Sequence, residues 1–195
     1  MAYVPLSAGP FVAHRVRADG HRFTVIEDRN GAPFGSIAAW TAPEQPGLIP
    51  VTAGMIFEAQ AGAWFVSTLA TPAEPIDPSL KGRAVFDATG RVCARFERKP
   101  GHIRFIHLPA GSLMWEKFTL RPTYRIDKAY SASRNVAHQI APGVSSRPFK
   151  GEIGDRFANG PDGVLGLLLA AWFTNNAIIE QMRRQDANNG NMGPS

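Results

Sequence analysis

The sequence predicts a mainly β protein, a barrel or sandwich of about a dozen short antiparallel strands, built around one buried apolar helix. Three observations support this fold class. Residues 164–173 (VLGLLLAAWF) contain no polar side chain. Many short segments before that run alternate apolar and polar residues. The chain holds 19 glycines and 16 prolines but only 19% charged residues, a composition typical of a turn-rich β protein.

The strands are predicted from alternation, because successive side chains of a strand face opposite sides of a sheet. In residues 91–97 this pattern places Val92, Ala94 and Phe96 on the buried face and Arg91, Arg95 and Glu97 on the wet face. Residues 120–127 alternate in the same way, with Pro122 at an edge or before the strand. Further strands are expected near residues 12–17, 22–27, 34–40, 54–58, 63–69, 83–87, 102–107, 113–119, 134–140 and 147–153.

Two hairpins share a weak internal repeat in which glycine follows aspartate by three positions. Asp28 precedes Gly31 and Asp87 precedes Gly90, and an apolar residue comes nine positions after each aspartate. A looser third copy runs through residues 124–140. Aspartate closes such turns by accepting hydrogen bonds from nearby backbone N–H groups, and glycine takes the positive-φ position. These aspartates are therefore expected to be turn residues.

The apolar run predicts a helix over residues 162–184 that has no wet face. Such a helix belongs in a protein core or in a bilayer. Its ten apolar residues span about 15 Å, roughly half of a bilayer's hydrocarbon thickness, so we interpret it as a core helix. Membrane contact and an oligomer interface are the alternatives. Residues 1–185 then form a single domain, and the tail 186–195 is expected to be disordered.

The hairpins and the apolar C-terminal helix together resemble the tubby C-terminal-like superfamily, which includes tubby domains, phospholipid scramblases and LURP-one-related proteins. The resemblance lies in Phe23–Ile37, Val85–Phe96, Tyr124–Ile140 and Val164–Met182, about a third of the chain. It implies a barrel of about twelve strands wrapped around a central hydrophobic helix. It also implies a non-enzymatic protein that binds phospholipid headgroups.

The scramblase members carry an acidic segment before the last helix that is proposed to bind calcium. The corresponding segment here, residues 155–162, has two carboxylates and an arginine, too few oxygen ligands for calcium. Tubby domains bind phosphoinositides through a Lys/Arg pair, and no single pair in this chain matches it.

The charge distribution provides the candidate binding site. The net charge is +5, yet residues 81–156 hold fifteen Lys and Arg against six Asp and Glu. Such an asymmetry indicates a surface that meets polyanions, although strands also display basic residues on an ordinary wet face. Arginine suits bidentate contact with phosphate. The candidate anion-binding residues are Arg91, Arg95, Arg98, Lys99, Arg104, Arg121 and Arg125, with the Arg98–Lys99 turn expected at a barrel end.

No catalytic, cofactor or metal motif is found. The five histidines form no HExxH run, and no glycine-rich phosphate loop or serine elbow occurs. Cys93 stands between Arg91 and Arg95, whose charges would lower its thiol pKa, but no base accompanies it. We therefore expect no enzyme, no cofactor and no metal.

The leading prediction is a cytoplasmic module that binds anionic phospholipid headgroups, phosphoinositides among them, at a membrane surface. Three alternatives stay open. The first is nucleic-acid binding by the same basic face, although no aromatic stacking platform accompanies it. The second is a scaffold that binds a protein partner. An enzyme or carrier that uses a barrel mouth is disfavoured, because a core helix fills the lumen.

Overall fold

The structure is a computed structural model that describes residues 1–18, 20–41, 53–67, 83–99, 103–117, 123–128, 137–140, 149–160 and 163–190. Within these residues the strands are β1 (Gly9–Ala18), β2 (His21–Asp28), β3 (Pro33–Thr41), β4 (Ala53–Ala59), β5 (Gly62–Ser67), β6 (Arg83–Asp87), β7 (Val92–Lys99), β8 (Ile103–Leu108), β9 (Gly111–Lys117), β10 (Thr123–Lys128), β11 (Ala137–Ile140) and β12 (Phe149–Ile153). The helices are α1 (Asp155–Ala158) and α2 (Gly163–Gly190). The predicted mainly β, antiparallel fold with one long C-terminal helix is confirmed.

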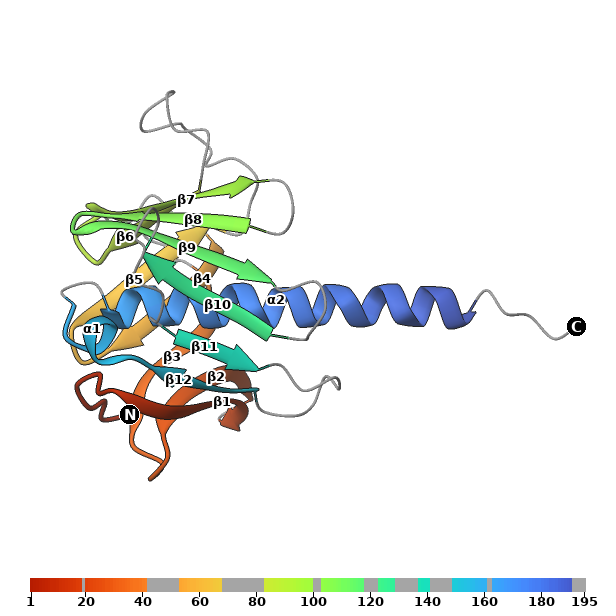
Figure 1. The fold of residues 1–195 in the computed structure, drawn as a ribbon, viewed down its shortest axis with the longest axis horizontal. Coiled ribbons are helices and arrows are strands. Elements are labelled where there is room, and N and C mark those ends of the chain that lie inside the picture. The colour runs from red at the N-terminus through yellow and green to blue at the C-terminus, as the bar shows by residue number, and fades with distance from the viewer. Residues whose placement is uncertain are drawn as a thin grey trace, which may run out of the picture.

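The strands pair in chain order from β1 to β12, and every pair is antiparallel. β1 also pairs with β12, with Gly9 opposite Ile153, so the strand order closes into a barrel. The two ends of the barrel differ, because α2 begins at one end and projects from the other (Figure 1). We call the end where α2 begins the base and the end where α2 leaves the mouth (Figure 1).

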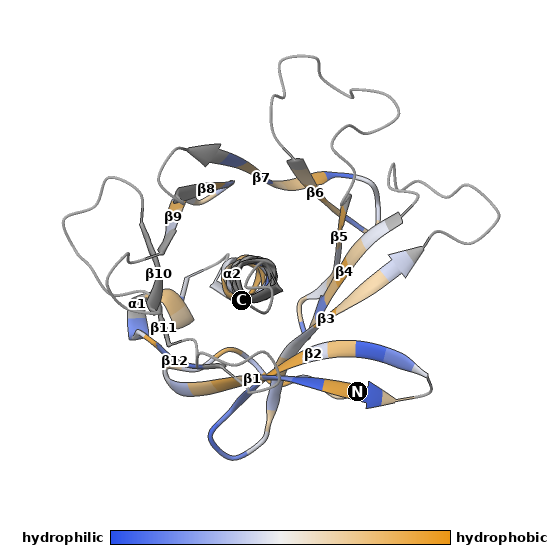
Figure 2. Cartoon of the chain, turned by 90° about the vertical axis from the view of Figure 1, so that its right-hand side faces the viewer, coloured by the Kyte–Doolittle hydropathy of each residue, from blue (hydrophilic) through white to orange (hydrophobic). Residues whose placement is uncertain are grey.

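α2 runs along the inside of the barrel and then out through the mouth (Figures 1 and 2). The described part of the helix begins one residue after the predicted start. It continues to Gly190, so the predicted helix end at 184 and the predicted disorder of residues 186–190 are wrong. The physical reason is that adding residues to a helix already formed requires far less free energy than nucleating a new one. Residues 191–195 lie outside the described residues.

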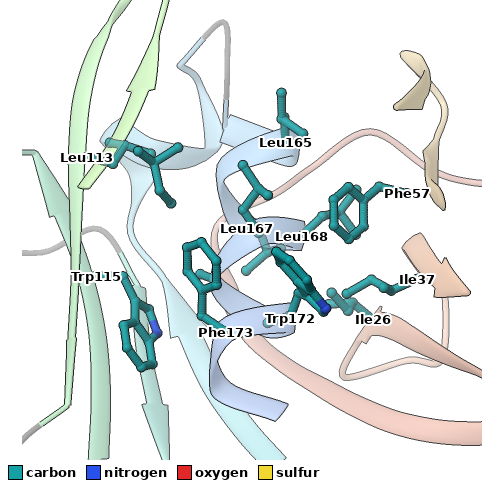
Figure 3. Close-up of a cluster of buried hydrophobic side chains, with 14 of the residues drawn as sticks. Ile26, Ile37, Phe57, Leu113, Trp115, Leu165, Leu167, Leu168, Trp172 and Phe173 are labelled. Carbon is teal, nitrogen blue, oxygen red and sulfur yellow. The ribbon is translucent and has the colours of Figure 1, made fainter. Parts of the chain in front are cut away.

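The core lies between the helix and the inner wall of the barrel (Figure 3). Every side chain from Leu165 to Thr174 is buried, which confirms that this part of the helix has no wet face. The ring of Trp172 makes edge contacts with Phe57 of β4 and Phe96 of β7, with centroids 5.9 and 5.8 Å apart. Phe173 also packs against Trp115 of β9, with centroids 5.7 Å apart, so aromatic rings pack between the helix and several strands of the wall.

The helix approaches β3 closely at Gly35. A Cβ on that residue would lie 2.6 Å from the carbonyl oxygen of Glu58 and 3.0 Å from a methyl of Leu168. At the base, Leu6 packs against the core beside Gly163, and the backbone N–H of Val4 donates to the Pro33 carbonyl at 2.9 Å. The N-terminal segment therefore covers part of the base.

The aspartate turns are confirmed. Oδ1 of Asp28 accepts hydrogen bonds from the N–H groups of Asn30 and Ala32, each at 2.8 Å. Oδ1 of Asp87 accepts from the N–H groups of Thr89 and Arg91 at 2.9 and 3.1 Å. Gly31 and Gly90 take φ values of 81° and 83°. Both turns lie at the base.

A register shift beside the second turn changes which residues face the core. The pairing of β6 with β7 shifts between Val85 and Phe86. Ala94 and Phe96 are buried in the core as predicted, but Val92 packs in a separate cluster around Phe65 and Phe86. The predicted inward position of Val92 is therefore wrong, because strict alternation does not survive a bulge.

Candidate functional site

The predicted anion-binding residues occupy several different positions in the barrel. Arg91 is exposed in the β6–β7 turn at the base. Arg95 is exposed in the middle of β7, opposite Ala84 of β6 and His107 of β8. Arg91 thus lies at the base, and Arg95 lies on the outer wall of the barrel.

Arg98 and Lys99 end β7 at the mouth, where Arg98 is directly opposite Arg104 of β8. Arg98 comes two positions after the buried Phe96, and Arg104 comes two positions before the buried Ile106, so both hold inner-face positions in the strand register. Lys99 and Arg125 belong to the alternate, outer set, with Arg125 opposite Glu116 and His138. Arg121 and the Pro100–Gly101 part of the predicted turn lie outside the described residues.

The structure brings a different set of basic residues together at the mouth. Arg98 and Arg104 share the inner-face set with basic residues of four other strands, all at the strand ends nearest the mouth. We call this set the basic collar: Arg15, Arg17, Arg22, Arg83, Arg98, Arg104 and Lys117. Within the described strands, no Asp or Glu holds an inner-face position at the mouth.

The collar is best defined on β1 and β2. Arg15 is opposite Thr24, and Arg17 is directly opposite Arg22. Nη2 of Arg15 donates a hydrogen bond to Oδ1 of Asn175 at 3.0 Å. This bond links β1 to α2 at the point where the helix leaves the barrel. Arg17 and Arg22 are exposed one register step further out.

These N-terminal arginines were not among the predicted site residues. The charge excess of residues 81–156 directed attention to the later strands, whereas the collar also draws on β1 and β2. One sequence signal was available: Arg15 and Arg17 continue the alternating set of Phe11 and Ala13, which are buried. Two arginines at the next alternate positions after buried apolar residues indicate where the buried inner face of a strand ends.

The base carries both signs of charge, with Arg29 and Arg91 exposed in its turns beside the aspartates. Asp28 and Asp87 lie in its turns and Asp155 opens α1 there. The backbone N–H of Ala32 is the main cause of a lowered pKa at Asp28, and the Thr89 hydroxyl is the main cause at Asp87. Both carboxylates are therefore held in the charged form, so the turns of the base offset their arginines with aspartates, whereas the collar is purely basic.

The remaining candidate groups offer no chemistry of their own. Cys93 packs partly against the core, and burial raises the pKa of its thiol, contrary to the predicted lowering. Trp115 is buried, and its indole N–H donates to the Thr174 hydroxyl at 3.2 Å. Among the described residues no cluster of three His, Cys, Asp or Glu side chains is arranged to hold a metal ion.

α2 extends well past the collar. Its fourteen residues after Asn176 rise about 20 Å at roughly 1.5 Å per residue. Over the described residues, no helix combines the length and the apolar character that crossing a bilayer requires. A comparison with protein-family models, with curated proteins and with solved structures finds no significant match for this chain.

Proposed function

We propose that this protein binds anionic phospholipid headgroups at a membrane surface, and that the basic collar is its contact site. The observation that carries the proposal is the gathering of basic residues at one end of the barrel. Basic residues of six strands hold inner-face positions at the mouth, whereas the turns of the base carry Asp28 and Asp87 beside Arg29 and Arg91. A surface of one sign attracts a polyanion and orients the protein toward it.

The projecting helix determines how a flat bilayer approaches the collar. α2 occupies the centre of the mouth and continues outward, and its outer half carries Glu180, Arg183, Arg184 and Asp186. Burying such charges in hydrocarbon costs several kcal/mol each. We therefore expect the bilayer surface to meet one sector of the collar at the rim of the mouth, with the projecting helix outside the hydrocarbon.

The resemblance to tubby-like proteins agrees with this proposal. A strand barrel around an apolar helix is the architecture that the resemblance implies, and we propose membership of that superfamily on this ground. The candidate residues Arg98 and Arg104 remain in the proposed site. Arg91 turns toward the base and is placed outside it.

The experiment is co-flotation of the protein with vesicles of neutral lipid, with and without phosphatidylglycerol, at low and at physiological salt. Two variants of equal charge are compared, Arg17→Gln/Arg22→Gln at the mouth and Arg29→Gln/Arg91→Gln at the base. All four arginines are exposed. Each basic residue near an anionic surface contributes about 1 kcal/mol, so the mouth variant should bind about 30-fold more weakly.

The base variant should float like the parent protein, and all binding should weaken as salt rises. Equal losses in the two variants would show that net charge alone matters and would remove the collar from the proposal. Absence of flotation at low salt would reject the lipid function. Retention on single-stranded DNA without flotation would favour nucleic acid instead.

A further inference from the structure

One pair of residues in the collar stands out because two positive charges face each other across a strand pair. Arg17 of β1 and Arg22 of β2 are register partners, which places their Cβ atoms about 5 Å apart on the same face. Like charges directly opposite each other destabilise a strand pair. Among the described neighbours, the register pairs Arg15–Thr24, Val16–Phe23 and Ala18–His21 carry no carboxylate. Asp19, in the turn that joins the two strands, lies outside the described residues.

The surroundings of the pair restrict what it binds. On the inner side, the next pair is Arg15 and Thr24, where Thr24 is buried and Arg15 already donates to Asn175. Arg17 and Arg22 are therefore the outermost pair on this face, next to the β1–β2 turn, where Gly20 takes a φ of 80°. A ligand that entered from the mouth would meet this pair before the Arg15–Asn175 contact.

We infer that Arg17 and Arg22 form a clamp for a phosphate monoester. A guanidinium group presents N–H donors in a planar fork that matches two phosphate oxygens. A monoester has three terminal oxygens and a charge close to −2 at neutral pH, so it can receive both forks and neutralise both charges. A phosphodiester has two terminal oxygens and a single charge, and it leaves one guanidinium uncompensated.

The inference deepens the proposed lipid function and rests on it for the source of the ligand. Monoester phosphate is present in phosphatidic acid and in other phosphorylated headgroups, and it is also present in small soluble metabolites. Phosphatidylglycerol provides the diester comparison at the membrane. Inorganic phosphate in solution tests the soluble source directly.

The deciding variant is Arg17→Lys/Arg22→Lys, which keeps both positive charges and removes both planar forks. The control is Arg29→Lys/Arg91→Lys in the turns of the base. Vesicles with phosphatidic acid and vesicles with phosphatidylglycerol are matched in surface charge, and binding to each is titrated by co-flotation. The thermal midpoint of each protein is measured in inorganic phosphate and in sodium chloride of equal ionic strength.

The parent protein and the control should prefer phosphatidic acid by about tenfold. The lysine variant should bind phosphatidylglycerol like the parent, but the ratio of its affinities for phosphatidic acid and phosphatidylglycerol should be close to one. Phosphate should raise the thermal midpoint of the parent and not that of the lysine variant. Equal binding of the two lipids by the parent would overturn the clamp and leave the proposed function standing.

If the protein binds neither kind of anionic vesicle, the proposed function is rejected. The thermal midpoints alone then test whether Arg17 and Arg22 form a phosphate clamp. A phosphate-dependent rise that the lysine variant lacks would assign the clamp to a soluble phosphate monoester. Equal behaviour of both proteins in phosphate would overturn the clamp as well.

Discussion

The indole N–H of Trp115 donates a hydrogen bond to the hydroxyl of Thr174, 3.2 Å away in the interior of the barrel. Both side chains are buried, and this bond joins β9 to the last buried turn of α2. One residue further along the helix, Asn175 accepts the hydrogen bond from Arg15. An apolar helix in an apolar lumen has little to fix its axial position, and these two polar contacts provide directional constraints at the mouth.

Thr174→Val should therefore lower the free energy of unfolding by about 1–3 kcal/mol, the usual cost of removing one partner of a buried hydrogen bond. Trp115→Phe should cost more, because it also removes ring volume from the core. A double-mutant cycle in urea should give a coupling of about 1 kcal/mol between the two positions. Strict additivity would mean that the bond contributes nothing to stability.

The close approach of α2 to β3 predicts a difference between two glycine substitutions. Gly35→Ala places a Cβ against the Glu58 carbonyl, a backbone atom that cannot move aside freely, and should cost about 1–3 kcal/mol. Gly166→Ala meets a methyl of Leu113 at 2.8 Å, a movable side-chain end, and gains about 1 kcal/mol of helix propensity. Urea unfolding should rank Gly35→Ala as the more damaging change, and the reverse order would contradict the packing described here.

The aspartate turns predict a contribution to acid stability. The pKa values of Asp28 and Asp87 are lowered in the folded protein, so the unfolded chain binds protons at higher pH than the folded one. Their contribution is complete above the unfolded pKa of about 4 and is lost as pH falls through the folded values. Asp28→Asn/Asp87→Asn should flatten the decline in stability between about pH 5 and pH 2.

The measurement is urea denaturation at a series of pH values. Glu152→Gln, which removes an exposed carboxylate from β12, is the control for a general change of charge. An unchanged pH profile in the double variant would show that the folded turns do not stabilise the charged carboxylates more than the unfolded chain does.

The outer half of α2 should be dispensable for folding. Among the helix residues whose burial the structure describes, 163–176, the last buried one is Thr174, and the buried core residues run from Leu165 to Phe173. A chain that ends after Asn176 should unfold cooperatively, with a thermal midpoint within about 5 °C of the parent. Loss of cooperative unfolding would show that the projecting half stabilises the barrel. By contrast, Leu168→Ala should cost about 2–5 kcal/mol, because Leu168 is fully buried.

The elements that local patterns determine were predictable from the sequence. The apolar run identified the core helix, and the Asp28–Gly31 and Asp87–Gly90 spacings identified two turns, because each depends on a few adjacent residues. The position of Val92 was not predictable, since a bulge reverses the alternation after it.

The candidate site was predicted only in part. Arg98 and Arg104 are brought together at the mouth, but Arg95 lies on the opposite face of the same strand from Arg98. The contribution of Arg17 and Arg22 depends on the pairing of β1 with β12, which joins residues about 140 positions apart in the chain. A count of charges along the sequence cannot contain that information.

The order of elements along the chain has a consequence for how the protein is made. The helix that fills the barrel follows all of the described strands, and the pair that completes the strand order joins the first strand to the last. A chain emerging from the ribosome thus exposes its apolar inner-face residues before their partner has been synthesised. High contact order slows folding, and exposed apolar strands aggregate. We therefore expect folding after synthesis, with a dependence on chaperones that a barrel with a locally formed core would not have.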